Sequence, residues 1–329
     1  MSQATTTLGV DVGGTNFRAA LFDAHGENLT GISAYPVKDF ATAESAVQKF
    51  FADNSEHAPP ARIIYATCGV VDADVPVIAS RNNPWQLNRA QFQQTLGIPT
   101  LFVNDFIPQA YAALGLNPAQ NFLLKKGSEP TEPKPIVVIG PGTGLGVSVL
   151  VPIMTEAGSV RFHAIATEGG NNPIGVRDKG DLALLYGLIN KCNIPHPTYE
   201  DILSGRGLPN LYRAICYKDG SIPGDVKTAE DVALLTASDI FARRTLEAFW
   251  TILAGFAATK VLDNNAAAVF VSGGVPPKLL KYFNPSAYAQ SFMLGRPESQ
   301  RSLLERSTHN LITAPDPAFI GLAQMVRQL

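Results

Sequence analysis

Short apolar runs alternate with amphipathic stretches along the first hundred residues of the chain. The runs are rich in β-branched residues, which favours strands, and they lie at residues 8–12, 17–22, 32–37, 62–67 and 100–103. Between them, apolar residues at helical spacing predict helices at residues 43–51, 91–96 and 107–114. Strands and helices in this alternation predict a mixed sheet flanked by helices, which is typical of the α/β class.

A second organisation follows the loop at residues 125–135, whose prolines, glutamates and lysines make it the best candidate for a connection between domains. The next stretch, residues 136–154, carries no charge and is long enough for a membrane span. Its prolines and glycines separate two β-branched runs, so we predict a strand, a glycine-rich turn and a second strand instead. Farther along, the pattern predicts mostly helices from residue 181, a long apolar-faced helix at 237–262, strands at 268–271 and 311–313, and a last helix at 318–329.

Two segments share one order of elements: a strand, a glycine turn that contains threonine, and another strand. They are residues 10–21 and 138–150, and two related half-folds would explain them. A chain of 329 residues also exceeds what one hydrophobic core usually organises. We therefore predict a small α/β domain at 1–115, on which the C-terminal helix at 309–329 packs back, and a large α/β domain at 116–308, with a cleft between the domains.

The charge balance narrows the classes of partner. The formal net charge is −2, which leaves no basic field for nucleic acid or for an anionic membrane. Cys68, Cys192 and Cys216 lie far apart and form no CxxC pair, so neither a disulfide framework nor a zinc site is expected. The N-terminal residues before Leu8 include no basic residue and no apolar segment. These features together lead us to expect a cytoplasmic protein.

The first predicted strand ends in Asp11-Val12-Gly13-Gly14-Thr15. The two glycines allow a sharp turn without a Cβ in the way. The backbone amides of such a turn can form an anion-binding concavity, to which the threonine hydroxyl adds a donor. An aspartate at the strand end suits Mg²⁺ held largely through water. An ordinary tight hairpin would also explain this turn taken alone.

A second glycine-rich turn lies between the two strands predicted at 136–154. It spans residues 140–146 and carries four glycines in seven residues, more than a simple hairpin requires. Commoner phosphate loops are excluded, because the chain has no Gly-Lys dipeptide for a Walker A loop and the glycine spacing does not fit GxGxxG. The HRD and DFG signatures of protein kinases are also absent.

Taken together, five segments make a more specific pattern than either turn. They are Asp11-Val12-Gly13-Gly14-Thr15-Asn16-Phe17-Arg18, Val103-Asn104-Asp105-Phe106, the turn at 140–146, Glu168-Gly169-Gly170, and the run from Ser204 to Arg213. In this order and spacing the chain resembles the bacterial glucokinase family over nearly its whole length. The zinc-binding cysteine cluster of the related repressor and sugar-kinase group is missing.

This resemblance implies a two-domain actin-like ATPase fold, which is ribonuclease H-like, with ATP in the cleft and a sugar beside it. The family's nucleotide-binding positions correspond here to Asp11, Val12, Gly13, Gly14, Thr15, Gly142, Thr143, Gly144, Gly273 and Gly274. Asp11 would contact Mg²⁺ through water. Members of the family are commonly dimeric, so the resemblance also implies a homodimer.

The family's catalytic aspartate corresponds to Asp105, which would accept the proton of the attacking hydroxyl. The alternative role for Asp105 is an N-cap of the helix that begins near Ile107. Sugar-binding positions carry over as Asn104, Asp105, Glu168, Asn171 and Glu200. For Glu200 the alternative is a solvated residue at the start of a helix.

Asn171 is the main departure, because the family usually has histidine after Glu-Gly-Gly. Asparagine keeps a donor and an acceptor but is shorter than imidazole. The resemblance thus implies an ATP-dependent kinase that phosphorylates the 6-hydroxyl of glucose. Asn171 leaves two alternatives open, a kinase of another hexose or an amino sugar, and a non-catalytic sensor of sugar or nucleotide.

Overall fold

The computed structural model describes residues 6–329 except 70, 73 and 80–82. Residues 1–5, which belong to the N-terminal segment without a predicted targeting signal, lie outside the described part. The chain forms two compact units, one made of residues up to 116 together with 314–329, and the other made of residues 117–313.

The first unit is built on a mixed sheet in which β1 and β2 form a hairpin and β1, β4 and β7 run parallel. Among the described residues its strand order is β3-β2-β1-β4-β7. Every residue of β1 is buried, as expected for a central strand covered on both faces. The strands are β1 (Thr7–Val12), β2 (Asn16–Phe22), β3 (Ser33–Pro36), β4 (Arg62–Thr67) and β7 (Thr100–Asn104).

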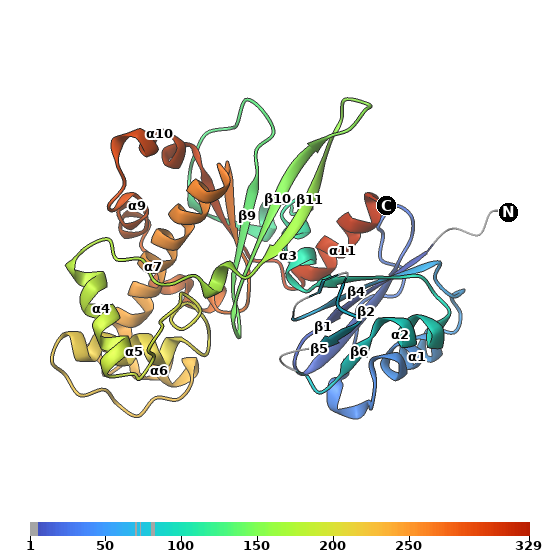
Figure 1. Cartoon of the computed structure of the whole chain (residues 1–329), viewed down its shortest axis with the longest axis horizontal. Coiled ribbons are helices and arrows are strands. Elements are labelled where there is room, and N and C mark those ends of the chain that lie inside the picture. The colour runs from blue at the N-terminus through green and yellow to red at the C-terminus, as the bar shows by residue number, and fades with distance from the viewer. Residues whose placement is uncertain (1–5, 70, 73, 80–82) are drawn as a thin grey trace. The chain divides into compact units, whose positions relative to one another are not determined.

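Helices cover this sheet, as Figure 1 shows for the blue-to-teal part of the chain and for the red helix α11. They are α1 (Ala43–Asp53), α2 (Arg89–Leu96), α3 (Phe106–Ala112) and α11 (Pro317–Arg327), with the short η1 (Val37–Asp39) and the small hairpin of β5 (Val77–Ala79) and β6 (Gln86–Asn88). Helix α11 packs against α3 and β1. A Cβ on Gly321 would lie 1.7 Å from the Pro108 carbonyl oxygen, so only glycine allows these two helices to approach so closely.

The second unit repeats the strand arrangement of the first. Its described strands follow the order β11-β10-β9-β12-β13-β8, with antiparallel pairs β11–β10 and β10–β9 and parallel pairs β9–β12 and β12–β13. This matches β3-β2-β1-β4-β7, and β8 is an additional antiparallel edge strand. The prediction of two related half-folds is therefore confirmed. The strands are β8 (Asn121–Lys125), β9 (Ile136–Pro141), β10 (Leu145–Met154), β11 (Val160–Thr167), β12 (Ala268–Val271) and β13 (Thr308–Ile312).

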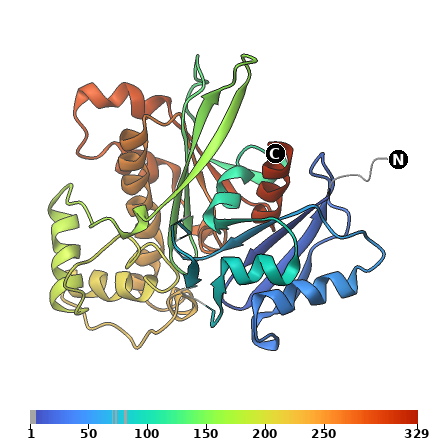
Figure 2. The ribbon, with the colours of Figure 1, turned by 45° about the vertical axis from the view of Figure 1, so that its right-hand side comes forward.

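The uncharged stretch at 136–154 forms β9, a turn and β10, as the sequence predicted. Figure 2 shows β10 and β11 as a long green hairpin that extends beyond the other strands of its sheet. The prediction for the C-terminal segment is wrong for its first residues, which form part of β13. We expected residues 309–329 to lie with the small domain, but β13 pairs with β12 and β8 in the second unit because its apolar side chains complete that sheet.

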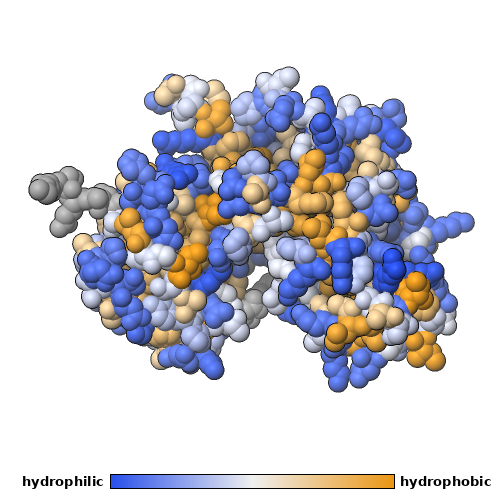
Figure 3. Space-filling view, turned by 180° about the vertical axis from the view of Figure 1, so that it is seen from behind, coloured by the Kyte–Doolittle hydropathy of each residue, from blue (hydrophilic) through white to orange (hydrophobic). Residues whose placement is uncertain are grey.

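Helix α7 (Ile240–Asn264) is the long central helix of the second unit. By length and composition it could cross a membrane, but 72% of its most apolar window is buried inside the protein, as in the core helix of a soluble protein. The remaining helices are α4 (Lys179–Asn190), α5 (Leu208–Lys218), α6 (Ala229–Leu235), α8 (Pro276–Leu279), α9 (Pro285–Met293) and α10 (Glu298–Arg306), with 3₁₀ turns η2 (Pro118–Gln120), η3 (Gly169–Asn171) and η4 (Leu280–Tyr282). Figure 3 shows mostly polar side chains on the visible face of each unit, with scattered apolar patches.

Candidate functional site

The first glycine turn connects β1 to β2 in the first unit. The Gly13 N–H donates to the Asn16 carbonyl oxygen at 3.0 Å, which closes the turn. Gly13, Gly14 and Thr15 are exposed, and a Cβ built on Gly13 would meet nothing within 4 Å. The turn thus leaves open space beside its backbone, as an anion-binding loop requires.

Asp11, at the end of β1, forms an ion pair with Arg18, which faces it across the hairpin. Arg18 also pairs with Asp316 at 2.8 Å, just before α11. Burial raises the pKa of the Asp11 carboxyl above its ordinary value, while the charge of Arg18 acts in the opposite direction. Sequence reasoning did not single out Arg18 as a partner, although its position in the same motif and opposite Asp11 in the hairpin is a usable signal.

The surroundings of Asp11 fit a metal ion that is contacted through water. Among the described residues there is no cluster of three or more His, Cys, Asp or Glu side chains that could hold a metal. Mg²⁺ commonly keeps several waters and uses one or two carboxylates together with phosphate oxygens. A single carboxylate at the phosphate turn fits such a water-mediated contact, and does not fit a cage made by protein alone.

Asn104 is the last residue of β7, two strands from β1, and Asp105 follows it directly. The Asn104 side chain is fixed on both sides, because its Nδ2 donates to the Gly69 carbonyl at 2.9 Å and its Oδ1 accepts from the Phe106 N–H at 2.8 Å. The Asp105 N–H donates to the Thr67 carbonyl at 2.9 Å. Asp105 occupies the N-cap position of α3, but its side chain makes no capping hydrogen bond. Asp105 thus occupies the position that the N-cap alternative predicts, without the side-chain hydrogen bond of a capping residue.

Parallel strands place Asp11 and Asp105 at one edge of the first sheet. Strands β1, β4 and β7 run in the same direction, so their carboxyl ends meet at the same edge. In open α/β sheets ligands bind outside these carboxyl ends. The two aspartates thus lie where a reacting group could be held.

The second glycine turn joins β9 to β10 in the second unit. The Gly142 N–H donates to the Gly144 carbonyl at 2.8 Å, and the Gly142 carbonyl accepts from the Gly205 N–H at 2.7 Å. Gly273 follows β12 with φ +87°, and a Cβ there would lie 2.4 Å from the Pro141 carbonyl oxygen. Only glycine suits both this backbone conformation and this approach. The predicted glycines at 142–144 and 273–274 are thus brought together at the ends of neighbouring strands.

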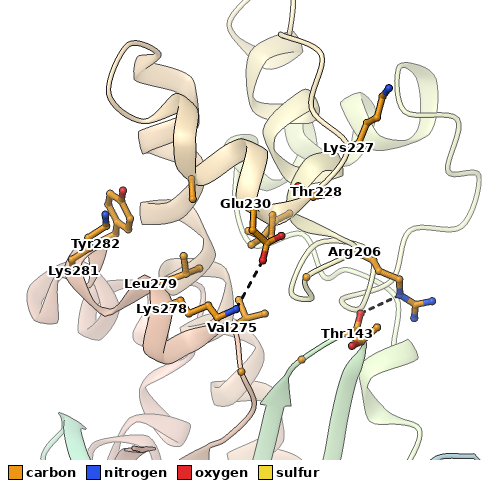
Figure 4. Close-up of a pocket in the computed structure, with 16 residues that line it drawn as sticks. Thr143, Arg206, Lys227, Thr228, Glu230, Val275, Lys278, Leu279, Lys281 and Tyr282 are labelled. Carbon is orange, nitrogen blue, oxygen red and sulfur yellow. Dashed lines mark hydrogen bonds and ion pairs between the residues drawn. The ribbon is translucent and has the colours of Figure 1, made fainter. Parts of the chain in front are cut away.

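A cavity of about 650 Å³ opens beside these glycines, and its size is typical of a ligand site. Figure 4 shows Arg206 reaching the Thr143 carbonyl, with Nε at 3.1 Å, and Lys278 pointing toward Glu230, 3.9 Å away. Sequence reasoning predicted the glycine edge of this cavity and missed its far walls. The lining residues are Gly142, Thr143, Gly205, Arg206, Leu208, Lys227, Thr228, Ala229, Glu230, Ala233, Gly274, Val275, Lys278, Leu279, Lys281 and Tyr282.

Glu168, Asn171 and Glu200 gather beside the same turn. The Asn171 Nδ2 donates to Glu168 Oε2 at 2.9 Å. The Glu200 N–H donates to the Gly170 carbonyl at 2.9 Å, and its carboxylate accepts from the Leu145 N–H at 2.8 Å. Because α5 begins only at Leu208, Glu200 is not a helix-start residue.

The Glu200 carboxylate also accounts for the glycine at position 144 and for the orientation of Arg206. A Cβ on Gly144 would lie 2.6 Å from Glu200 Oε2, so the turn and the carboxylate are in close approach. Arg206 donates to Glu200 Oε1 at 3.3 Å and to the Thr143 carbonyl. Arg206 therefore links Thr143, expected to bind phosphate, to Glu200, expected to bind sugar. Each unit carries its own part of the predicted site: Asp11 to Thr15, Asn104 and Asp105 belong to the first, and the other predicted residues to the second.

Comparison with known proteins agrees with this geometry. A sequence model of the family described as Glucokinase matches residues 8–329. The glucokinase of Pseudomonas aeruginosa is 33% identical over 322 residues, which cover 97% of this chain and 93% of that protein. A crystal structure of glucokinase from an Antarctic psychrotroph superposes with a TM-score of 0.85 at 27% identity, covering 99% of this chain and all of that one.

A further likeness concerns the fold alone. A ROK family glucokinase from Streptomyces griseus, solved in complex with glucose and AMPPNP, has a TM-score of 0.62 at 19% identity and covers 98% of this chain and 100% of that one. The predicted α/β class and the two-domain actin-like ATPase fold are confirmed by these structural likenesses. With a family match over nearly its full length, this chain belongs to the glucokinase family.

Proposed function

We propose that this enzyme transfers the γ-phosphate of ATP to the 6-hydroxyl of glucose. The observation that carries the proposal is the pair of glycine turns at strand ends combined with a carboxylate, Asp105, at the end of β7. Phosphoryl transfer needs mainly positioning and charge neutralisation, together with a group that accepts the proton of the attacking hydroxyl. Family membership supports glucose as the acceptor.

The nucleotide would be held by both turns. The cavity beside Gly142, Thr143 and Gly274 has room for a nucleoside, with apolar walls such as Leu279 for the base. The Gly13 and Gly142 N–H groups close their own turns, so the backbone N–H groups of residues 14–15 and 143–144 would donate to phosphate oxygens. The Streptomyces griseus protein of similar fold was solved with an ATP analogue, which supports ATP as the donor.

Asp11 would orient Mg²⁺ through water. When bound, Mg²⁺ supplies positive charge that neutralises the phosphates during transfer. Arg18 already binds the Asp11 carboxylate, so this arginine would limit the motion of the carboxylate.

On the sugar side, Asn104, Glu168, Asn171 and Glu200 would exchange hydrogen bonds with sugar hydroxyls, and Asp105 would accept the proton of the reacting hydroxyl. We propose that the two units act as the two domains of the enzyme and that their closure excludes water, since an open site would hydrolyse ATP. We also propose that the protein works in the cytoplasm, as a homodimer.

The direct test measures ADP release with glucose, mannose, fructose and glucosamine. We expect glucose-dependent ADP release and a fall in kcat of about 10²–10⁴-fold in Asp105→Ala, the range typical of removing a general base. Asp53→Ala, which removes an exposed carboxylate paired with Lys49, should leave kcat unchanged. No turnover with any of these sugars in the native protein, with Asp105→Ala indistinguishable from it, would refute the proposal.

Asn171 is the observation that favours a second candidate, a kinase of another hexose or of an amino sugar. A site built on hydrogen bonds discriminates strongly when one partner changes. A higher kcat/KM for one of the other three sugars than for glucose would support this candidate. Binding of sugar without any phosphorylation would support a non-catalytic sensor instead.

A further inference from the structure

Lys260 is a charged residue buried near the C-terminal end of α7, with 8% of its surface exposed. Its Nζ donates to Asn172 Oδ1 at 2.8 Å and to Asp263 Oδ2 at 2.8 Å. The same atom lies 5.5 Å from the centroid of the Phe256 ring. Because burying a charge costs free energy unless its hydrogen bonds are satisfied, these contacts hold the ammonium group in one place.

Asn172 is held by its backbone as well as by Lys260. Its N–H donates to the Gly169 carbonyl at 3.2 Å, and its carbonyl accepts from the Tyr199 N–H at 3.1 Å. The Tyr199 ring packs on Phe256 with a centroid distance of 4.5 Å. Helix α7 therefore supports Asn172 through Lys260 and supports the neighbouring chain segment through Phe256.

These contacts join two segments that carry proposed sugar-binding residues. The segment at 168–173 bears Glu168 and Asn171, and the segment at 198–200 bears Glu200. The segments pair through the bridge between Pro173 and Thr198 and through the hydrogen bond from the Glu200 N–H to the Gly170 carbonyl. A change at Asn172 would thus be transmitted to all three acidic or amide side chains.

We propose that Lys260 is a positioning residue that fixes the sugar-binding segments through Asn172. The inference rests on the proposed function of Glu168, Asn171 and Glu200. Lys260 would act by limiting the motion of these side chains, since small misplacements of binding groups weaken recognition strongly. The nucleotide turn contacts Glu200 but is also held by the Gly205 N–H and by the close approach of Gly273, so its geometry would depend less on Lys260 than that of the sugar-binding segments.

The competing explanation is purely structural, namely that Lys260 secures the end of α7 through Asp263. The two partners of Lys260 separate the explanations. Lys260→Met keeps the length of the side chain and removes both contacts, Asn172→Leu removes only the first, and Asp263→Asn weakens only the second. Asn172→Asp keeps an oxygen acceptor for the ammonium group and serves as the conservative variant.

The experiment measures KM for glucose and for ATP in these variants and in the double variant Lys260→Met/Asn172→Leu. We expect KM for glucose to rise about tenfold in each single variant of the Lys260–Asn172 pair, as for the loss of a hydrogen bond to a charged group. The double variant should show no further rise in KM for glucose, because both substitutions remove the same Lys260–Asn172 interaction. KM for ATP should change by less than about twofold throughout, and Asp263→Asn and Asn172→Asp should stay near the native values.

A second readout is the rise in thermal unfolding temperature caused by glucose, which should be clearly smaller in Lys260→Met and in Asn172→Leu than in the native protein at the same glucose concentration. The proposal is overturned if both variants keep the native KM for glucose, if the two KM values rise equally, or if Asp263→Asn reproduces the effect. Should Lys260→Met fail to fold, Asn172→Leu still tests the contact. A native protein that neither phosphorylates nor binds any hexose would refute the proposed function. An active native protein whose Lys260→Met and Asn172→Leu variants keep the native KM for glucose would refute this inference alone.

Discussion

Asn171 is the side chain that leaves the preferred sugar substrate open. Its amide donates to Glu168 Oε2 at 2.9 Å, so it orients a neighbouring carboxylate, and under the proposed function it would also offer atoms to a sugar. An imidazole at this position would reach farther and could bind a sugar hydroxyl directly, while keeping a donor for Glu168.

We expect Asn171→His to raise kcat/KM for glucose relative to mannose, fructose and glucosamine by about tenfold, the value of one added hydrogen bond to a substrate. Asn171→Ala should lower kcat/KM for glucose by a similar factor, because it also releases Glu168. The measurement is a kcat/KM panel over the four sugars for the three proteins. An unchanged ranking in both variants would show that position 171 does not contact the sugar.

At the scale of single residues, the sequence predicted the glycine turns well and the partners of individual side chains poorly. The turns at 13–14 and 142–144 were found because a missing Cβ is visible in the sequence itself. The pairing of Asp11 with Arg18 depends on the register of the β1–β2 hairpin, and the contact of Lys260 with Asn172 joins residues 88 positions apart. The first pairing has a signal in the hairpin motif, whereas the second is not encoded in any local pattern or spacing.

Strand β13 illustrates what the elements contribute beyond their residues. His309, on β13, is fully buried, and its ring nitrogens lie 3.0 Å from the hydroxyls of Tyr288 on α9 and Ser307 at the end of α10. One side chain therefore ties the strand to two helices. Burial, together with the nearby charge of Lys125, lowers the pKa of His309 well below its ordinary value.

This lowered pKa predicts a pH dependence of stability. The unfolded chain binds a proton at His309 below about pH 6.5, whereas the folded protein does not until a lower pH, so the free energy of unfolding falls as the pH drops below 6.5. His309→Gln should reduce this fall while lowering stability at neutral pH by about 1–3 kcal/mol. Urea unfolding of both proteins from pH 7.5 to 5 measures it. A difference between the two proteins that stays constant with pH would contradict the prediction.

The elements that the sequence predicted and those that it missed differ in burial. Strands β9 and β10 were predicted because continuous β-branched runs are distinctive. Edge strand β11 was missed, since many of its residues are exposed and its polar and apolar positions follow no strict alternation. Strand β8 was missed for a similar reason, because it is short, carries Asn and Lys at its ends and needs β13 as a partner.

At the scale of the molecule, the two units have separate hydrophobic cores. Leu322 on α11 is fully buried in the first unit, and Leu253 on α7 is fully buried in the second. Truncating either residue should weaken mainly its own unit, if the units open independently.

We expect Leu322→Ala to lower the protection of amides in β1 and β4 against hydrogen exchange by about 2–5 kcal/mol, the usual cost of such a cavity. Protection in β9 and β10 should stay near the native level. Leu253→Ala is the matched variant and should give the opposite pattern. Equal losses in both units for both variants would show that the protein unfolds as a single cooperative body.

The return of the chain to the first unit also has a consequence during synthesis. Residues up to 116 are made first, but α11, which packs on β1 and α3, is made some 200 residues later. At 5–20 residues per second this delay lasts on the order of 10–40 s. Most of the second unit is made during that time, but β13, which completes its sheet, is made only just before α11. The unit that is translated first is therefore completed last, and its uncovered apolar face is where we expect chaperones to bind the nascent chain.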